Sequence, residues 1–254
     1  MNRREFMALS AFAGIGSLTG CVDGTTGSNP QPRGSARLGS RPVLPGTLAP
    51  AGIQTLGLGG SRDALLYVPT GHVVSEPLPL LVLLHGAGTS ASQWFGSYGA
   101  RAEAARMIVL APDSRRSTWD MFFGEFGPDI DFIDQALDAT FGRCSVDPSR
   151  IAVGGFSDGA SYALALGIAN GDLFNRIVAF SPGFLSIDEP IGRPSILVSH
   201  ATDDTVLPVA VTRGNVARLR ASGYPVEFLE FTGGHAVPAS VSDAAFRWLA
   251  GGSI

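Results

Sequence analysis

Lysine is absent from this 254-residue sequence, because all 18 of its basic residues are arginine. The absence excludes Schiff-base enzymes, pyridoxal phosphate enzymes, P-loop nucleotide binders and Ser-Lys hydrolases, since each of these classes depends on a lysine amine. The formal net charge is −4. Because a basic patch is the usual footprint of nucleic-acid binding, we expect no nucleic-acid partner.

Charged residues are also few, at 16%, whereas apolar residues make up 45% of the chain. This composition allows one sizeable hydrophobic core. The longest apolar stretch near the N-terminus, from about Met7 to Leu18, is too short to span about 30 Å of hydrocarbon. It follows Arg3 and Arg4 and closes on small residues before Cys21. Residues 1–20 are therefore predicted to be an export signal.

Two short motifs refine that prediction. The letters NRREFM resemble a twin-arginine signal, and LTGC resembles a bacterial lipobox. The second resemblance implies cleavage before Cys21 and lipid attached to that cysteine, which would hold the protein on a membrane of the cell envelope. The alternative is a plain secretory signal with an incidental cysteine and a secreted or periplasmic product.

Residues 21–50 are dense in glycine, serine, threonine and proline and have few large apolar side chains. Such a composition predicts a flexible linker, with the catalytic domain at residues 51–254. The second cysteine, Cys144, has no intramolecular partner if Cys21 carries lipid, so we expect a packed and unreactive thiol.

The folded part alternates short apolar runs with longer helical stretches. Residues 53–69 predict an opening hairpin, and the later apolar runs are continuous, as in buried parallel strands. We expect an α/β fold, with a mostly parallel sheet covered by helices on both faces and no lid domain. The helices are expected near residues 91–105, 129–142, 158–170, 209–222 and 239–250.

A Gly-x-Ser-x-Gly pattern centres on Ser157, directly after one apolar strand and directly before a helix. A sharp strand-to-helix turn needs small neighbours, which Gly155 and Gly159 supply, and it lifts the serine hydroxyl above the sheet edge. The pattern alone is weak, because serine also favours the start of a helix as a capping residue. The rest of the chain has to decide between a nucleophile and a turn serine.

Two later strand ends carry the side chains that a serine nucleophile needs. Asp203 and Asp204 follow one predicted strand, and His235 follows the next, in a glycine-flanked loop. Because the carboxyl ends of parallel strands meet at one edge of a sheet, these side chains should lie near Ser157. A histidine takes the serine proton, and a carboxylate orients the histidine. The alternative is a metal site made by these residues with His200.

The same edge offers hydrogen-bond donors for an oxyanion. The sequence LLHGAG at residues 83–88 ends a buried strand in small residues, so the amide of Ala87 is expected opposite the amide of Asp158. The carboxylate of Asp158 would either oppose a developing negative charge or point away from it. We expect it to point away, stabilised by the N-terminus of its helix.

Together, LLHGAG, VDPSRIAVGGFSDGASYALAL, SHATDDTVLP and GGHAVP resemble the α/β-hydrolases over about residues 60–250, most closely the phospholipase/carboxylesterase branch. The resemblance implies a sheet of about eight strands and a Ser157, Asp204, His235 triad without a cofactor. Asp204 is selected over Asp203 because the acid of that branch stands four residues after the strand-end His200 and four before a proline. The chain departs from the branch at Asp158, where glutamine, methionine or asparagine is common.

The sequence thus predicts a lipid-anchored serine hydrolase that cleaves carboxylic esters through an acyl-enzyme. The alternatives are a thioesterase or peptidase with the same triad, and a noncatalytic binding protein of the envelope. Four aromatic residues after the strand ending near residue 112 either line an acyl pocket or pack onto the scaffold: Trp119, Phe122, Phe123 and Phe126.

Overall fold

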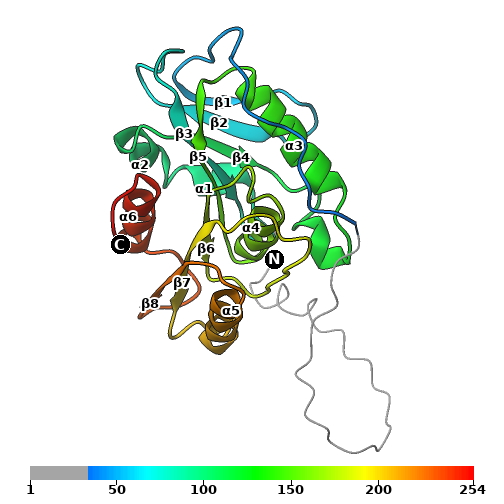
Figure 1. Ribbon diagram of the computed structural model, residues 1–254, viewed down its shortest axis with the longest axis vertical. Coiled ribbons are helices and arrows are strands. Elements are labelled where there is room, and N and C mark those ends of the chain that lie inside the picture. The colour runs from blue at the N-terminus through cyan, green and yellow to red at the C-terminus, as the bar shows by residue number, and fades with distance from the viewer. Residues whose placement is uncertain (1–33) are drawn as a thin grey trace, which may run out of the picture. The chain divides into compact units, whose positions relative to one another are not determined.

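The computed structural model describes residues 34–254, which belong to one compact unit with a single eight-stranded sheet (Figure 1). The sheet order is β1-β2-β4-β3-β5-β6-β7-β8. The strands are β1 (Gly52–Thr55), β2 (Ala64–Val68), β3 (Leu78–Leu84), β4 (Ile108–Pro112), β5 (Val146–Phe156), β6 (Arg176–Phe180), β7 (Ser195–Ala201) and β8 (Val226–Phe231). The predicted export signal, Cys21 and the first part of the predicted linker lie outside the described residues.

Strand pairing confirms the predicted mostly parallel sheet. β1 and β2 form the expected antiparallel hairpin, and β2 also pairs antiparallel with β4. From β4 to β8 every pairing is parallel. The carboxyl ends of β3, β5, β7 and β8 therefore open onto the same edge of the sheet.

Helices cover both faces of this sheet (Figure 1). The helices are α1 (Ala91–Phe95), α2 (Gly99–Ala104), η1 (Asp120–Phe123, a 3₁₀ helix), α3 (Pro128–Phe141), α4 (Asp158–Ala169), α5 (Val209–Ala221) and α6 (Ala239–Leu249). Along β3, Leu80, Val82 and Leu84 face a core shared with α3, α4 and α5. Leu81 and Leu83 face a second core shared with α1, α2 and α6. Each such buried side chain contributes about 1.5–3 kcal/mol, so β3 anchors the sheet from both sides.

The helix predicted over residues 91–105 is wrong in one respect, because the structure divides it into α1 and α2. The division falls at Gly96–Gly99, where two glycines flank Ser97 and Tyr98. Glycine in a helix interior costs about 1 kcal/mol relative to alanine, which favours a break there. The buried ring of Tyr98 stacks on Phe246 of α6 and holds the break in place.

The domain begins earlier than the sequence predicts. Residues 34–50 were expected to be linker, but this segment runs along α3 (Figure 1). Ala36 and Leu38 are buried in the core that includes side chains of α3 and α4. Arg37 and Arg41 both pair with Asp172, beyond α4. The prediction failed because it averaged composition over thirty residues, whereas two apolar side chains and two arginines suffice to anchor this segment.

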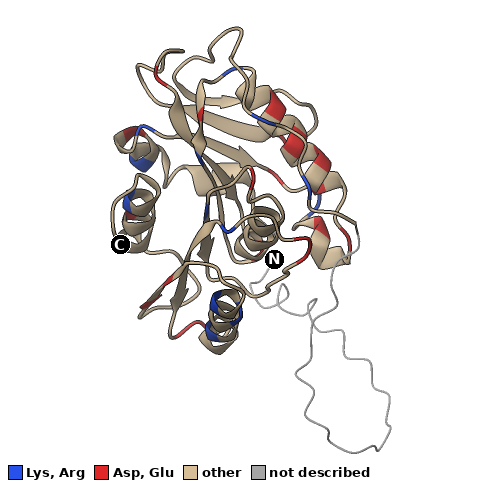
Figure 2. Cartoon of the chain, viewed as in Figure 1, with Lys and Arg blue, Asp and Glu red and all other residues tan. Residues whose placement is uncertain are grey.

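Charge is unevenly spread over the surface. Acidic residues follow one another along α3, and arginines gather on α5 (Figure 2). One of the α3 carboxylates, Asp134, accepts hydrogen bonds from the amides of Gly39 and Ser40. Part of this acidic face therefore serves to hold residues 39–40.

Two further sequence predictions concern membranes and thiols. No helix within residues 34–254 has both the length and the apolar character needed to cross a bilayer. Cys144 is fully buried and free, and burial raises the pKa of its thiol to about 12. The predicted packing of Cys144 is confirmed, and a thiol with so high a pKa is a poor nucleophile at neutral pH.

Candidate active site

Ser157 stands at the turn between β5 and α4. Its φ of +56° is in the left-handed region that residues with side chains rarely adopt. A Cβ at Gly155 would overlap the carbonyl of Gly159, and a Cβ at Gly159 would overlap the carbonyls of Leu84 and His85. The turn can be this tight only because both flanking residues are glycine. Its sharpness presents the serine side chain at the carboxyl edge of the sheet.

Two other strand ends bring partners to Ser157. His235, in the loop after β8, places Nε2 2.9 Å from Ser157 Oγ. Its Nδ1 lies 2.6 Å from Oδ2 of Asp204, in the loop after β7. An ionised carboxylate only accepts hydrogen bonds, so Nδ1 carries the ring proton and Nε2 is free to accept from the serine hydroxyl. The three side chains form one continuous hydrogen-bonded line.

The carboxylate of Asp204 is buried yet fully supplied with donors. The amides of Val206 and Leu207 donate to Oδ1, both at 2.9 Å. Burial alone would raise the pKa of Asp204, but the Leu207 amide, His235 and the Val206 amide together lower it below the ordinary value. The group is therefore an ionised acceptor at neutral pH.

His200, near the end of β7, also contacts this carboxylate. Its Nε2 lies 2.8 Å from the carbonyl of Leu207 and 3.2 Å from Asp204 Oδ2. The Leu207 carbonyl and the Asp204 carboxylate both accept hydrogen bonds, so His200 Nε2 carries a proton and helps to hold the Asp204 carboxylate in place. Asp203, by contrast, is exposed. No three His, Cys, Asp or Glu side chains in the described part of the chain gather as a metal cluster would.

The loop after β3 approaches the serine from the other side. A Cβ on Gly86 would lie 3.5 Å from Ser157 Cβ, so the loop passes close to the serine. The amide N–H groups of Ala87 and Asp158 have no acceptor among residues 34–254. Within the described residues both predicted donors are therefore unpaired, and Asp158 directly follows Ser157 in the turn.

The carboxylate of Asp158 has a partner that the sequence did not indicate. Its Oδ2 accepts a hydrogen bond of 2.6 Å from the hydroxyl of Thr118, in the loop after β4. Burial raises the pKa of Asp158, whereas Thr118 and the nearby His235 lower it. The net pKa of Asp158 is raised, and its partner Thr118 lies 40 residues earlier in the sequence, where no local pattern indicates it.

The aromatic residues after β4 separate into two pairs. Trp119 and Phe126 are buried, which settles them as scaffold residues, whereas Phe122 and Phe123 are 39% and 49% exposed. A different aromatic row adjoins the histidine: the rings of Phe156 and His235 lie 4.6 Å apart, and Trp94 lies 4.8 Å from Phe156. The sequence reasoning missed this row, because Trp94 and Phe156 come from distant segments.

An eight-stranded, mostly parallel sheet with Ser157 at the β5–α4 turn, Asp204 after β7 and His235 after β8 is the arrangement of the α/β-hydrolase fold. Solved structures agree on the fold. An S-formylglutathione hydrolase from Staphylococcus aureus is similar with a TM-score of 0.65 and 16% identity, covering 81% of this chain and 100% of that one. A Bacillus cereus carboxylesterase is similar with a TM-score of 0.59 and 17% identity, covering 76% and 96%.

Sequence comparison narrows the class. The family model for phospholipase/carboxylesterase matches residues 125–246, which include Ser157, Asp204 and His235. Over these residues the chain resembles the phospholipase/carboxylesterase family, and the solved structures that share its fold include esterases. It is also 25% identical, over 173 residues, to a bifunctional acetylxylan esterase/xylanase from Neocallimastix patriciarum. The match covers 64% of this chain and only 24% of that larger protein.

Proposed function

We propose that this protein is a serine esterase that cleaves carboxylic esters through an acyl-enzyme. Ser157 is the nucleophile, His235 the general base and acid, and Asp204 the group that orients His235. The amides of Ala87 and Asp158 stabilise the oxyanion. The observation that carries the proposal is the hydrogen-bonded line from Ser157 through His235 to the buried Asp204, with distances of 2.9 Å and 2.6 Å.

The reaction follows from this geometry. Ser157 Oγ attacks the ester carbonyl carbon while its proton passes to His235 Nε2, and the carbonyl oxygen becomes an oxyanion. His235 then gives that proton to the leaving alkoxide, and the acyl group remains on Ser157. Water attacks the acyl carbon in the second half, with His235 again as base, and releases the carboxylic acid. Asp204 stays ionised and stabilises the imidazolium in both halves.

The first experiment treats the purified full chain with a fluorophosphonate probe and reads labelling by intact mass. We expect labelling of the parent and none of Ser157→Ala. Ser161→Ala is a matched control, because Ser161 is buried in α4 and should not react. A folded parent that resists the probe would contradict the serine hydrolase and favour a noncatalytic binding protein.

The second experiment separates ester from thioester and amide substrates. A panel with a shared acetyl group and different leaving groups is chosen because the relative named above is an acetylxylan esterase. We expect kcat/KM to be highest for oxygen esters. A higher value for thioesters or amides would replace the esterase with the thioesterase or peptidase that the same triad permits.

We further propose that the chain is exported and held on the cell envelope by lipid on Cys21. The support is the sequence of residues 1–21, with its paired arginines, short apolar stretch and LTGC motif. The full chain, produced in a bacterial host fed an alkyne-tagged fatty acid, should carry the tag and sediment with membranes. Cys21→Ser should lose both properties. A parent without the tag would favour the secreted or periplasmic alternative.

A further inference from the structure

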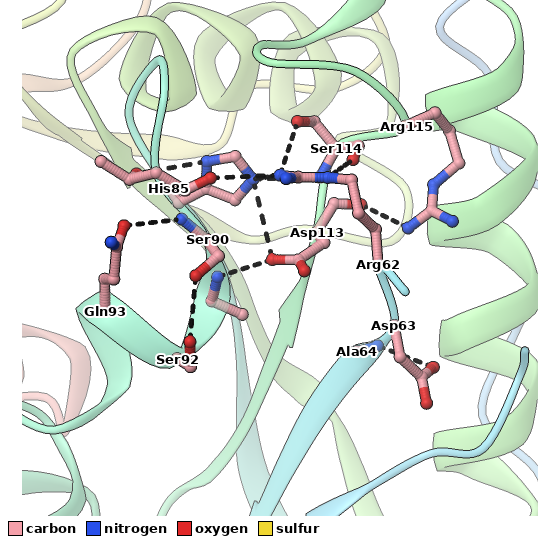
Figure 3. Close-up of polar contacts among 12 residues, drawn as sticks. Arg62, Asp63, Ala64, His85, Ser90, Ser92, Gln93, Asp113, Ser114 and Arg115 are labelled. Atoms are coloured by element: carbon pink, nitrogen blue, oxygen red, sulfur yellow. Dashed lines mark hydrogen bonds and ion pairs between the residues drawn. The ribbon is translucent and has the colours of Figure 1, made fainter. Parts of the chain in front are cut away.

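The loop after β3 is held by an arginine from the connection between the first two strands of the sheet. Arg62 lies in the turn between β1 and β2, far from the serine in the chain, and its guanidinium lies between the ring of His85 and Ser114 (Figure 3). Nη2 is 3.2 Å from His85 Nε2 and 3.1 Å from the carbonyl of Thr89. Nε donates to the carbonyl of Ser114. One guanidinium thus joins the loop after β3 to the loop after β4.

The contacts of His85 determine where its proton lies. The backbone amide of Ser114 donates to Nε2 at 3.0 Å, and a backbone amide cannot accept. Nε2 is therefore unprotonated and receives hydrogen bonds from both Ser114 and Arg62. The neutral ring carries its proton on Nδ1, which lies 2.8 Å from the carbonyl of Gly86 and donates to it.

The position of the Gly86 carbonyl oxygen determines the direction of the Ala87 amide N–H. The hydroxyl of Thr89 also donates to Gly86 O, at 2.7 Å, so two side chains hold this oxygen. In a trans peptide the C=O and the following N–H point in opposite directions. Holding Gly86 O on the side of His85 therefore turns the Ala87 N–H to the other side, where it has no acceptor among the described residues.

We propose that Arg62 is a positioning residue for this esterase, which acts through His85 on the peptide between Gly86 and Ala87 and so aims the Ala87 amide at the oxyanion. The inference rests on the proposed function. It adds a residue that touches neither substrate nor triad. An oxyanion donor is effective only when it is already oriented, because reorientation during the reaction would offset the gain.

Charged groups around His85 explain why an arginine suits this position. Burial lowers the pKa of His85, contact with Gly86 O and Asp113 opposes the shift, and the guanidinium of Arg62 supports it. Asp113 Oδ1 is 3.9 Å from Nε2 and also accepts from the amide of Ala91. Arg115 donates to the carbonyl of Asp113 rather than to its carboxylate. If Arg62 were absent, the nearby carboxylate of Asp113 would favour protonation of His85. The Nε2–H of the imidazolium would then face the N–H of Ser114, so that two donors would meet without an acceptor.

The test compares Arg62→Gln with Arg143→Gln in the full chain. Arg143 also donates to a backbone carbonyl, that of Leu56, but it precedes β5 at the opposite edge of the sheet. For Arg62→Gln we expect kcat to fall about tenfold or more with KM within about twofold, because a misdirected oxyanion donor weakens the transition state alone. We expect Arg143→Gln to keep the parent values.

The pH profile distinguishes positioning from general stability. In Arg62→Gln, kcat should fall several-fold further than in the parent as the pH becomes acidic, because burial still lowers the pKa of His85 but the guanidinium no longer adds to that shift. In the double variant Arg62→Gln with His85→Asn, a donor stays near the position of Nδ1 but no imidazole can be protonated there. The additional loss of kcat at acidic pH should therefore disappear. A parent-like kcat or pH profile in folded Arg62→Gln would overturn the inference. So would an equal loss in Arg143→Gln.

Arg62→Lys and the fluorophosphonate labelling of the parent distinguish a failure of the positioning role from a failure of the proposed esterase. If Arg62→Gln does not fold, Arg62→Lys takes its place, because one ammonium cannot reach the acceptors served by two guanidinium nitrogens. We expect a fall in kcat of at least about threefold, with the parent pH profile; parent-like kcat would overturn the inference. A parent that fails fluorophosphonate labelling would overturn the esterase itself, whereas a labelled parent with an unaffected Arg62 variant would overturn only the positioning role.

Discussion

Asp204 Oδ2 lies 2.6 Å from Nδ1 of His235, whereas among residues 34–254 the carboxylate of the adjacent Asp203 has only a 3.4 Å contact from Thr202. The two aspartates are neighbours in the chain and equal in chemistry. Their difference arises from the turn after β7, which buries one carboxylate against His200 and leaves the other exposed. This makes them a matched pair for mutagenesis.

Asp204→Asn should lower kcat by about 10³–10⁴ without unfolding the protein, because an amide in place of the acid favours the wrong tautomer of His235. Asp203→Asn should leave kcat within about twofold, as expected of an exposed residue outside the site. Steady-state kinetics with one acetyl ester measures both. Equal losses in the two variants, or a larger loss in Asp203→Asn, would show that Asp204 is not the acid that orients His235.

Asp158→Asn tests whether the carboxylate after the nucleophile opposes catalysis. Its oxygen is held by Thr118 at 2.6 Å, so we expect kcat to change less than about tenfold, well below the loss of an oxyanion donor. Thr118→Val, which removes the partner and keeps the shape, is the companion variant. An increase in turnover of tenfold or more for Asp158→Asn would show that the negative charge works against the transition state.

Phe122→Ala and Phe123→Ala test whether the exposed aromatic pair after β4 contacts substrate. These rings are 39% and 49% exposed, so truncation should cost little stability, and acyl-chain preference should shift toward shorter chains as apolar contact is lost. The ratio of kcat/KM for hexanoyl and acetyl esters measures the shift. An unchanged ratio in both variants would remove these residues from the pocket.

Asp172→Asn tests the attachment of residues 34–50. Hydrogen bonds from Arg37, opposed by burial and supported by Arg41, lower the pKa of Asp172 to about 2. A folded-state pKa below the unfolded value stabilises the protein above about pH 4, and this contribution disappears as the pH falls toward 2. Because the pair is partly exposed, we expect a loss of about 0.5–1 kcal/mol at pH 6.

Urea unfolding of the parent and Asp172→Asn at pH 6, 4 and 2.5 measures that difference. The gap should narrow steadily as the pH falls. A constant gap would mean that the carboxylate charge is not what holds the segment.

Much of the fold and the order of the site residues could be predicted from local signals. Continuous apolar runs indicated buried parallel strands, and the strand ends at Ser157, Asp204 and His235 had to share an edge, because parallel strands finish on the same side of a sheet. The glycines at 155 and 159 announced a tight turn. These inferences need only the pattern within each segment and a general property of parallel sheets.

Other features depend on contacts between distant segments and leave no periodic trace. Nothing near Asp158 indicates Thr118, and nothing in the turn before β2 indicates that Arg62 reaches His85. The packing of Ala36 and Leu38 was hidden because a glycine- and proline-rich composition describes an average, whereas burial depends on a few side chains meeting a complementary surface. Local sequence patterns thus determined the helices and strands and the order of the reacting groups. Long-range packing determined the hydrogen-bond partners of those groups, because distant segments come within hydrogen-bond distance only in the folded protein.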